Sequence, residues 1–135
     1  MVIKVLLVHK YLLPVALLYT GLITWLSLGK IIIPGNIAVQ GSDKIGHLLA
    51  YFVFTIIWFL FFFYSERQKR RFFESLWISS LAGFLYGILM EFCQAIFTDY
   101  RSPDWYDFIA NTSGIILSVC VLSVLQKKLV KKRRY

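Results

Sequence analysis

Four long apolar runs, each bounded by a short charged segment, constrain this chain more than any other feature. No charged residue occurs between Tyr11 and Gly29, and three later runs of similar length follow, one interrupted by a single carboxylate. A helix needs about 20 apolar residues to cross the hydrocarbon core of a bilayer. The sequence therefore predicts an all-α membrane protein, a bundle of four transmembrane helices over about residues 11–29, 44–64, 73–97 and 105–126.

The composition excludes a soluble domain of this size. Hydrophobic residues make up 59% of the chain and the mean hydropathy is +0.68, which is more apolar surface than 135 residues can bury. We expect one domain over residues 1–135. A cleaved signal peptide is the alternative for the first run, but that run is longer than a usual signal core and no small-residue cleavage site follows it, so a retained helix is predicted.

The basic residues are clustered and predict the topology. Twelve of the fifteen Lys and Arg residues lie in residues 1–10, 66–71 and 127–135, whereas only Lys30, Lys44 and Arg101 lie in the other two loops. The positive-inside rule therefore predicts that both termini are cytoplasmic, with residues 127–135 as a basic tail. Three separate blocks do not form the continuous basic face of a nucleic-acid-binding protein, so no nucleic-acid partner is predicted.

A carboxylate inside the third run marks the candidate site. Glu91 follows a long apolar stretch and precedes a charged loop by a few residues. A carboxylate in a membrane helix is costly and is a candidate functional group for that reason. Two interpretations remain open: Glu91 is hydrogen-bonded to Asn111 or paired with Arg101 as a structural group, or it is a protonated acid that gives or carries a proton.

Helical spacing brings other polar side chains to the depth of Glu91. Residues three or four apart share one face of a helix, and three of the predicted helices carry such a set near their outer ends. The sets are Asp43, His47 and Tyr51; Glu91 and Gln94; and Asp104, Asp107 and Asn111. We expect them to form one polar pocket at the outer leaflet.

Small residues lie beneath this predicted pocket. Gly83 and Gly87 on the third helix, and Gly114 and Ser118 on the fourth, are each four residues apart. Small residues at this spacing let membrane helices approach closely. The sequence therefore predicts that the third and fourth helices pack against each other through these positions.

Each polar residue has a chemical role and a structural alternative. His47 is a candidate catalytic partner of Glu91, or a hydrogen-bond donor that holds a loop. Asp104 and Asp107 are candidate binding residues, or caps of the fourth helix. Arg101 is the candidate anion contact, because a guanidinium group binds phosphate through two hydrogen bonds.

No cofactor is predicted. The carboxylates and the imidazole of the candidate site are acceptable ligands for a divalent cation, but their spacing matches no metal motif and indicates a metal only weakly. Cys93 and Cys120 are expected at different depths, too far apart for a disulfide.

At these residues the sequence resembles the VanZ-like family of membrane proteins. The matching segments are DKIGHLLAYF (43–52), YGILMEFCQ (86–94) and RSPDWYDFIANTSG (101–114), and the resemblance covers roughly Gly41 to Ser118. The family's polar positions fall on Asp43, Lys44, His47, Tyr51, Glu91, Gln94, Arg101, Asp107, Asn111 and Gly114. Two residues depart from the pattern: Ser118 stands where the family often has glycine, and Asp104 is an additional acid.

The resemblance implies a protein of the bacterial-type cytoplasmic membrane, and the family's namesake is associated with low-level resistance to the glycopeptide teicoplanin. It implies no particular reaction, so three functions remain open. The first is a binding site for an envelope lipid or lipid-linked precursor, with Arg101 and Lys44 on its phosphate. The second is an enzyme in which Glu91 and His47 act as acid and base. The third is a structural or partner-binding module, and a homodimer is a further expectation that would suit transport of a small solute.

Overall fold

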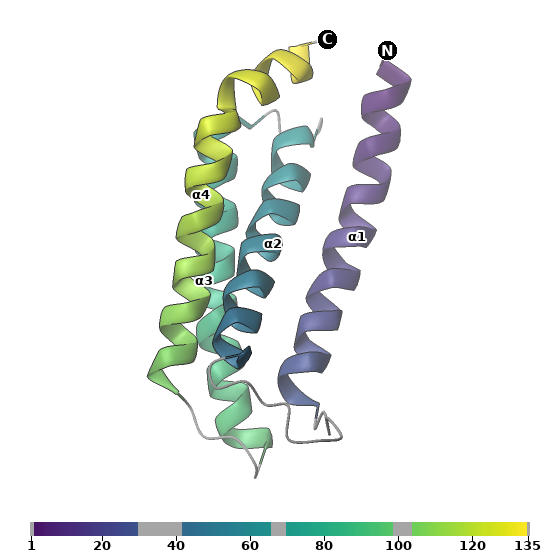
Figure 1. Ribbon diagram of the computed structural model, residues 1–135. Coiled ribbons are helices and arrows are strands. Elements are labelled where there is room, and N and C mark those ends of the chain that lie inside the picture. The colour runs from purple at the N-terminus through teal and green to yellow at the C-terminus, as the bar shows by residue number, and fades with distance from the viewer. Residues whose placement is uncertain (1, 30–41, 66–69, 99–103, 135) are drawn as a thin grey trace.

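The computed structural model describes residues 2–29, 42–65, 70–98 and 104–134. In these residues the chain forms four helices and no strand: α1 (Val2–Leu28), α2 (Ser42–Tyr64), α3 (Phe72–Phe97) and α4 (Trp105–Arg134). Each helix is long and apolar enough to cross a membrane, which confirms the predicted four-helix membrane bundle. Both termini lie at the same end of the bundle (Figure 1), while the side of the membrane on which they lie stays a prediction.

Two helices extend beyond the predicted boundaries. α1 begins at Val2 instead of about Tyr11, so that Pro14 lies inside the helix and not in its first turn. The helix continues through Pro14 because proline removes only one backbone hydrogen bond from it. α4 runs through most of the predicted tail to Arg134 instead of ending at Gln126, because lysine and arginine are strong helix formers.

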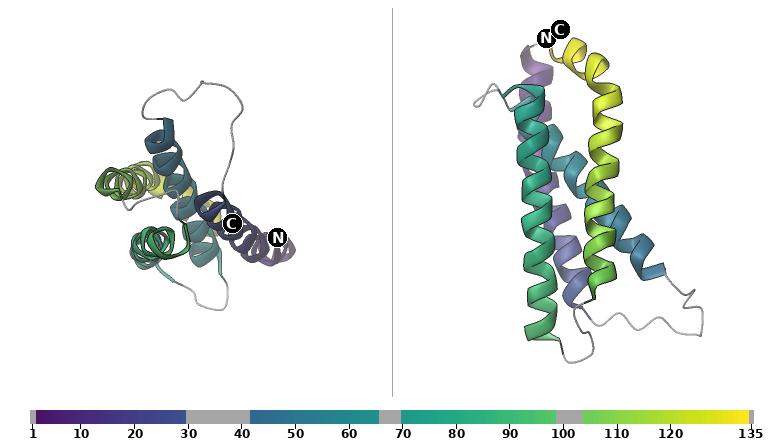
Figure 2. Two further views of the ribbon diagram at one scale, coloured as in Figure 1. Left: turned by 90° about the horizontal axis from the view of Figure 1, so that it is seen from below. Right: turned by 90° about the vertical axis from the view of Figure 1, so that its left-hand side faces the viewer.

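α2 is the central helix of the bundle. It contacts each of the other three helices, and the end-on view in Figure 2 shows it between α1 on one side and the pair α3 and α4 on the other. α1 contacts α2 and α3 but, over the described parts of both helices, not α4. The arrangement is therefore a three-helix group with α1 added along α2 and α3.

A glycine allows α2 and α4 to approach closely. A Cβ atom at Gly114 would collide with the carbonyl oxygen of Leu48 and lie 3.0 Å from the backbone nitrogen of Phe52, both on α2. The prediction that Gly114 packs against α3 is therefore wrong. Spacing identified the small face of α4 correctly, but it carries no information about which neighbouring helix that face meets.

The glycines of α3 face both α2 and α4. A Cβ atom at Gly83 would lie 3.2 Å from Thr55 Oγ1 on α2 and 3.3 Å from Ile115 on α4. The Gly87 position is equally close to Tyr51, at 3.3 Å. These glycines therefore bring α3 into the groove between α2 and α4, which sets the position of Glu91 one turn further along.

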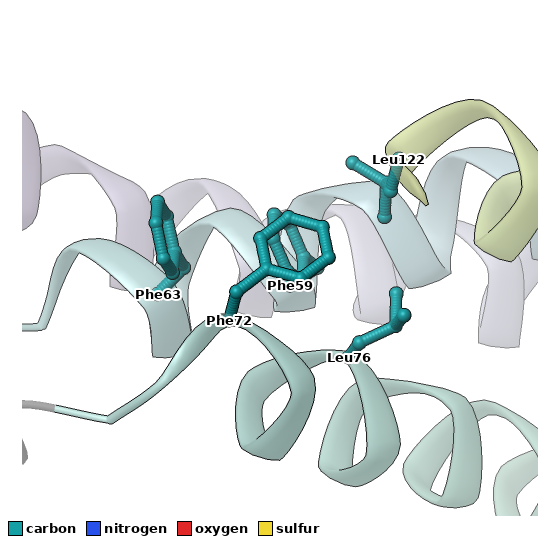
Figure 3. Packing of buried hydrophobic residues seen from close by; sticks show 5 residues of the cluster. All are labelled: Phe59, Phe63, Phe72, Leu76 and Leu122. Atoms are coloured by element: carbon teal, nitrogen blue, oxygen red, sulfur yellow. The ribbon is translucent and has the colours of Figure 1, made fainter. Parts of the chain in front are cut away.

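An aromatic cluster holds the end of the bundle nearest the termini (Figure 3). Phe59 and Phe63 of α2 stack with ring centroids 5.3 Å apart, and Phe72 at the start of α3 meets both rings edge-on. Leu76 and Leu122 complete the cluster from α3 and α4. This apolar core fixes one end of the three-helix group and leaves the opposite end to the polar residues.

α1 is attached through side-chain hydrogen bonds. Tyr19 donates to a backbone carbonyl of α2 at 3.0 Å, and Trp58 Nε1 of α2 donates to Thr20 Oγ1 at 3.2 Å. Thr24 Oγ1 is hydrogen-bonded to the hydroxyl of Tyr86 on α3, at 2.6 Å. Both threonines also donate to carbonyl oxygens four residues earlier in α1, at 2.7 Å.

Gly114→Ala should destabilise the bundle by about 1–3 kcal/mol, because the added methyl group must push the α2 backbone away. Gly21→Ala is the matched control, since nothing lies within 4 Å of its Cβ position and alanine is the better helix former. Thermal unfolding of both purified variants in one detergent measures the difference. Equal melting temperatures would contradict the close approach of α2 and α4.

Candidate functional site

The polar ends of three helices meet at the end of the bundle opposite the termini. α2 and α4 begin there and α3 ends there (Figure 1). The residues that meet, here called the polar cluster, are Asp43, Lys44 and His47 from α2, Glu91 from α3, and Asp104, Asp107 and Asn111 from α4 and the residue before it. They are connected by ion pairs on one side and by hydrogen bonds on the other.

Lys44 is the centre of the ion pairs. Its Nζ lies 2.6 Å from Asp104 Oδ2 and 3.1 Å from Asp43 Oδ2, and it also donates to Asp107 Oδ1. An ammonium group has three N–H donors, and three carboxylates engage this one. Lys44 was expected to contact an anion, but its donors are already occupied within the protein.

Asp104 joins the ion pairs to the start of α4. Its Oδ1 accepts a hydrogen bond from the backbone N–H of Tyr106 at 2.9 Å, which makes it the N-cap of the helix. The hydrogen bond from Lys44 holds the pKa of the Asp104 carboxyl below its usual range, and the Tyr106 N–H acts in the same direction. Asp104 therefore caps α4, as one of its two predicted interpretations states, and also pairs with Lys44.

A chain of contacts leads from the ion pairs to Glu91. His47 Nε2 lies 3.7 Å from Asp107 Oδ2, and His47 Nδ1 lies 3.0 Å from the side-chain oxygen of Asn111. Because that oxygen only accepts hydrogen bonds, we assign the proton of a neutral His47 to Nδ1. Asn111 Nδ2 in turn donates to Glu91 Oε1 at 3.5 Å, so the expected contact between Glu91 and Asn111 is present.

One oxygen of Glu91 has no hydrogen-bond partner among the residues that the structure describes. Glu91 Oε2 is buried and no described residue forms a hydrogen bond with it. Glu91 also lines a cavity of about 410 Å³ between α3 and the start of α4, together with Ile88, Asp104, Trp105 and Phe108. A buried acceptor without a partner costs about 1–3 kcal/mol. Glu91 therefore combines a buried oxygen that lacks a hydrogen-bond partner among the described residues with a place in the wall of the cavity.

Two predicted binding residues, Tyr51 and Gln94, lie outside the polar cluster. Tyr51 is 3% exposed and packs against Gly87. Gln94 is 2% exposed and its amide donates to the backbone carbonyl of Ser27 on α1, at 3.1 Å. Arg101 lies outside the described residues. Tyr51 and Gln94 therefore join helices to one another.

Sequence reasoning missed the apolar walls of the cavity. Ile88, Trp105 and Phe108 gave no chemical signal, because exposed apolar side chains on a membrane helix normally face lipid. Their positions did carry one hint: Ile88 is one turn before Glu91, and Trp105 and Phe108 follow Asp104 on the other helix. The cavity walls could therefore have been predicted only from their position next to the candidate polar residues in the sequence.

No group of three or more His, Cys, Asp or Glu side chains in the described part of the chain has the geometry to hold a metal ion. Lys44 explains why the three aspartates of the cluster do not form a cation site. Its ammonium group lies among the three aspartates, where a cation would otherwise sit.

The chain belongs to the VanZ/LLP1 family, whose model matches residues 8–126. It is also similar to an uncharacterized protein, C11E3.10, of Schizosaccharomyces pombe, with 30% identity over 93 residues. That match covers 69% of this chain and 51% of the relative, so the chain spans about half of the relative's length. No solved structure matches the chain. Family and helices together identify a VanZ-like multi-pass membrane protein.

Asn111→Asp should destabilise the protein, because it replaces the amide that donates to Glu91 with a second carboxylate. The double variant Asn111→Asp with Glu91→Gln exchanges acid and amide and should recover much of the lost stability. Thermal unfolding of the two single variants and the double variant measures this coupling. A double variant no more stable than Asn111→Asp would exclude a direct interaction between positions 91 and 111.

The ion pair of Asp104 should make stability depend on pH in the acid range. Because the folded-state pKa is lowered, the carboxylate stabilises the fold above its unfolded value of about 4, and this stabilisation is lost as the pH falls through the folded-state pKa. Asp104→Asn should lack this part of the acid-induced loss. Melting temperatures of wild type and variant between about pH 6 and pH 3 test the prediction, and parallel curves would contradict it.

Proposed function

We propose that this VanZ/LLP1-family protein binds an envelope lipid or a lipid-linked precursor in the cavity beside Glu91, in a bacterial-type cytoplasmic membrane. One observation carries the proposal: Glu91, which has a buried carboxylate oxygen without a hydrogen-bond partner among the described residues, lines a cavity whose other walls are mostly apolar. An amphiphile suits both features. Its hydrocarbon part matches the apolar walls, and a polar head can satisfy the carboxylate oxygen.

The cavity lies where a lipid can reach it from the side. Ile88 and Trp105 are 44% and 77% exposed, and exposed apolar residues on membrane helices normally face lipid. Ligand entry therefore needs no passage through the bundle. Under the predicted topology the cavity belongs to the outer leaflet, where lipid-linked precursors of the envelope are used.

The described charges favour a head group that donates hydrogen bonds. An ionised Glu91 only accepts them, so hydroxyl, amine and amide groups complement its free oxygen. Lys44 is held by three aspartates and is not available to a phosphate. Arg101 remains the proposed phosphate contact for a precursor that carries a phosphate, because a guanidinium group can bind phosphate through two hydrogen bonds.

Acid–base catalysis is a second candidate, and the contacts from Asp107 to Glu91 favour it. Asp107 faces one nitrogen of His47, while the other nitrogen is hydrogen-bonded to Asn111, which contacts Glu91. In this function Glu91 gives or takes a proton at the bound head group, and His47 positions it through Asn111. Action on a wall precursor would connect either function to glycopeptide (teicoplanin) tolerance.

Glu91→Gln should lower the retention of lipid-linked precursors, whose head groups donate hydrogen bonds, about tenfold or more, because it removes a charged acceptor at the head group. Wild type and variant are reconstituted in nanodiscs, incubated with polyprenyl phosphate and with lipid-linked wall precursors, and purified again. Mass spectrometry then measures both retained and converted lipid. Retention without conversion supports binding, and conversion that is lost in the variant supports the enzyme.

Glu74→Gln is the matched control for this experiment. It makes the same substitution in the same helix, but Glu74 is exposed near the opposite end of α3. Retention by this control should equal that of wild type. If wild type retains no lipid, or if both glutamine variants lose the lipid equally, the proposed site is wrong.

A further inference from the structure

The last turns of α4 fold onto the end of the bundle. The side chains of Leu129 and Val130 pack against the aromatic cluster described above. Arg133 donates to the backbone carbonyl of Arg70, and its guanidinium group lies 4.7 Å from the centre of the Phe63 ring. Residues 126–134, here called the C-terminal segment, are therefore a docked part of the bundle and not a free tail.

Among the described side chains of this segment, the exposed ones are all lysines. Lys127, Lys128, Lys131 and Lys132 are all exposed, whereas Leu129, Val130 and Arg133 turn toward the bundle. None of the four lysines forms an ion pair with a described residue. The spacing of the two sets gives the segment one face that packs against the bundle and one strongly basic, exposed face.

The length of α4 places the segment at the membrane surface. Thirty helical residues extend about 45 Å, while the hydrocarbon core is about 30 Å thick. Figure 1 shows that the last turns of α4 bend away from the axis of the helix and across the end of the bundle toward α1. A bend at this point keeps the lysines at head-group depth instead of carrying them into the aqueous phase.

We propose that the C-terminal segment binds anionic lipid head groups of the leaflet nearest the termini. Charge complementarity selects the partner, because four exposed ammonium groups face a layer that contains anionic phosphates. The contacts of Leu129, Val130 and Arg133 with the bundle fix the depth of the four lysines, so the lysines form a surface in the plane of the bilayer. This site is separate from the cavity beside Glu91 and does not depend on the function proposed for it.

Lipid-specific quenching tests the proposal on the full-length protein. A fluorophore is attached to a cysteine at Ser123, which is exposed just before the segment, after Cys93 and Cys120 are changed to alanine. Nanodiscs contain phosphatidylglycerol and phosphatidylcholine in equal amounts, with bromine on one lipid or on the other. The ratio of the two quenching constants reports the local enrichment of the anionic lipid.

We expect enrichment of at least about threefold in this cysteine-substituted reference protein, and a fall toward onefold when all four lysines become glutamine. The matched control changes the same four lysines to arginine, which keeps the charge and should keep the enrichment. Enrichment in the reference protein should also fall as the ionic strength rises from about 0.05 M to about 0.5 M. Equal quenching by both lipids in the reference protein, or undiminished enrichment in a folded glutamine variant, would overturn the proposal.

Discussion

The close approach of α2 and α4 is the contact on which the polar cluster depends. Gly114 lets the α4 backbone lie against Leu48, and this brings the first turns of the two helices together. His47, the neighbour of Leu48, is thereby within hydrogen-bond distance of Asn111, one turn before Gly114. A larger side chain at position 114 would push α2 and α4 apart next to His47 and Asn111, which must lie close together to form their hydrogen bond. A backbone contact therefore determines the geometry of side chains that lie a full turn away.

Polar groups within a membrane must find their partners in the protein. In the described residues this requirement is met stepwise, from Lys44 among its carboxylates, through Asp107, His47 and Asn111, to Glu91. Glu91 is the last residue in this sequence of contacts: it lines the cavity, and its buried Oε2 has no hydrogen-bond partner among the described residues. If the network had only a structural role, each of its buried polar atoms would be expected to have a hydrogen-bond partner within the protein. The unpartnered oxygen of Glu91 is the feature on which the proposed binding at the cavity rests.

The apolar runs and the glycine spacing were sufficient to predict four helices and the faces that approach closely. The helical positions of His47, Glu91 and Asn111 also indicated that they share one depth. Pairing between helices was not predictable, because periodicity shows which face is small or polar but not which helix lies opposite. For this reason Gly114 was assigned to the wrong neighbour and Gln94 was taken for a ligand contact. The engagement of Lys44 by aspartates some 60 residues away is equally invisible in a linear pattern.

The double hydrogen bonding of the threonines in α1 has a consequence for the order of assembly. α1 is synthesised first, but the tryptophan and tyrosine that bond to Thr20 and Thr24 belong to α2 and α3. Both threonines donate to carbonyl oxygens of their own helix, so their hydroxyl hydrogens are already satisfied when α1 enters the bilayer alone. Their free lone pairs can then accept hydrogen bonds from the later helices. The two threonines are therefore compatible with α1 as a single helix in lipid, and they can also accept hydrogen bonds from α2 and α3 once those helices pack against it.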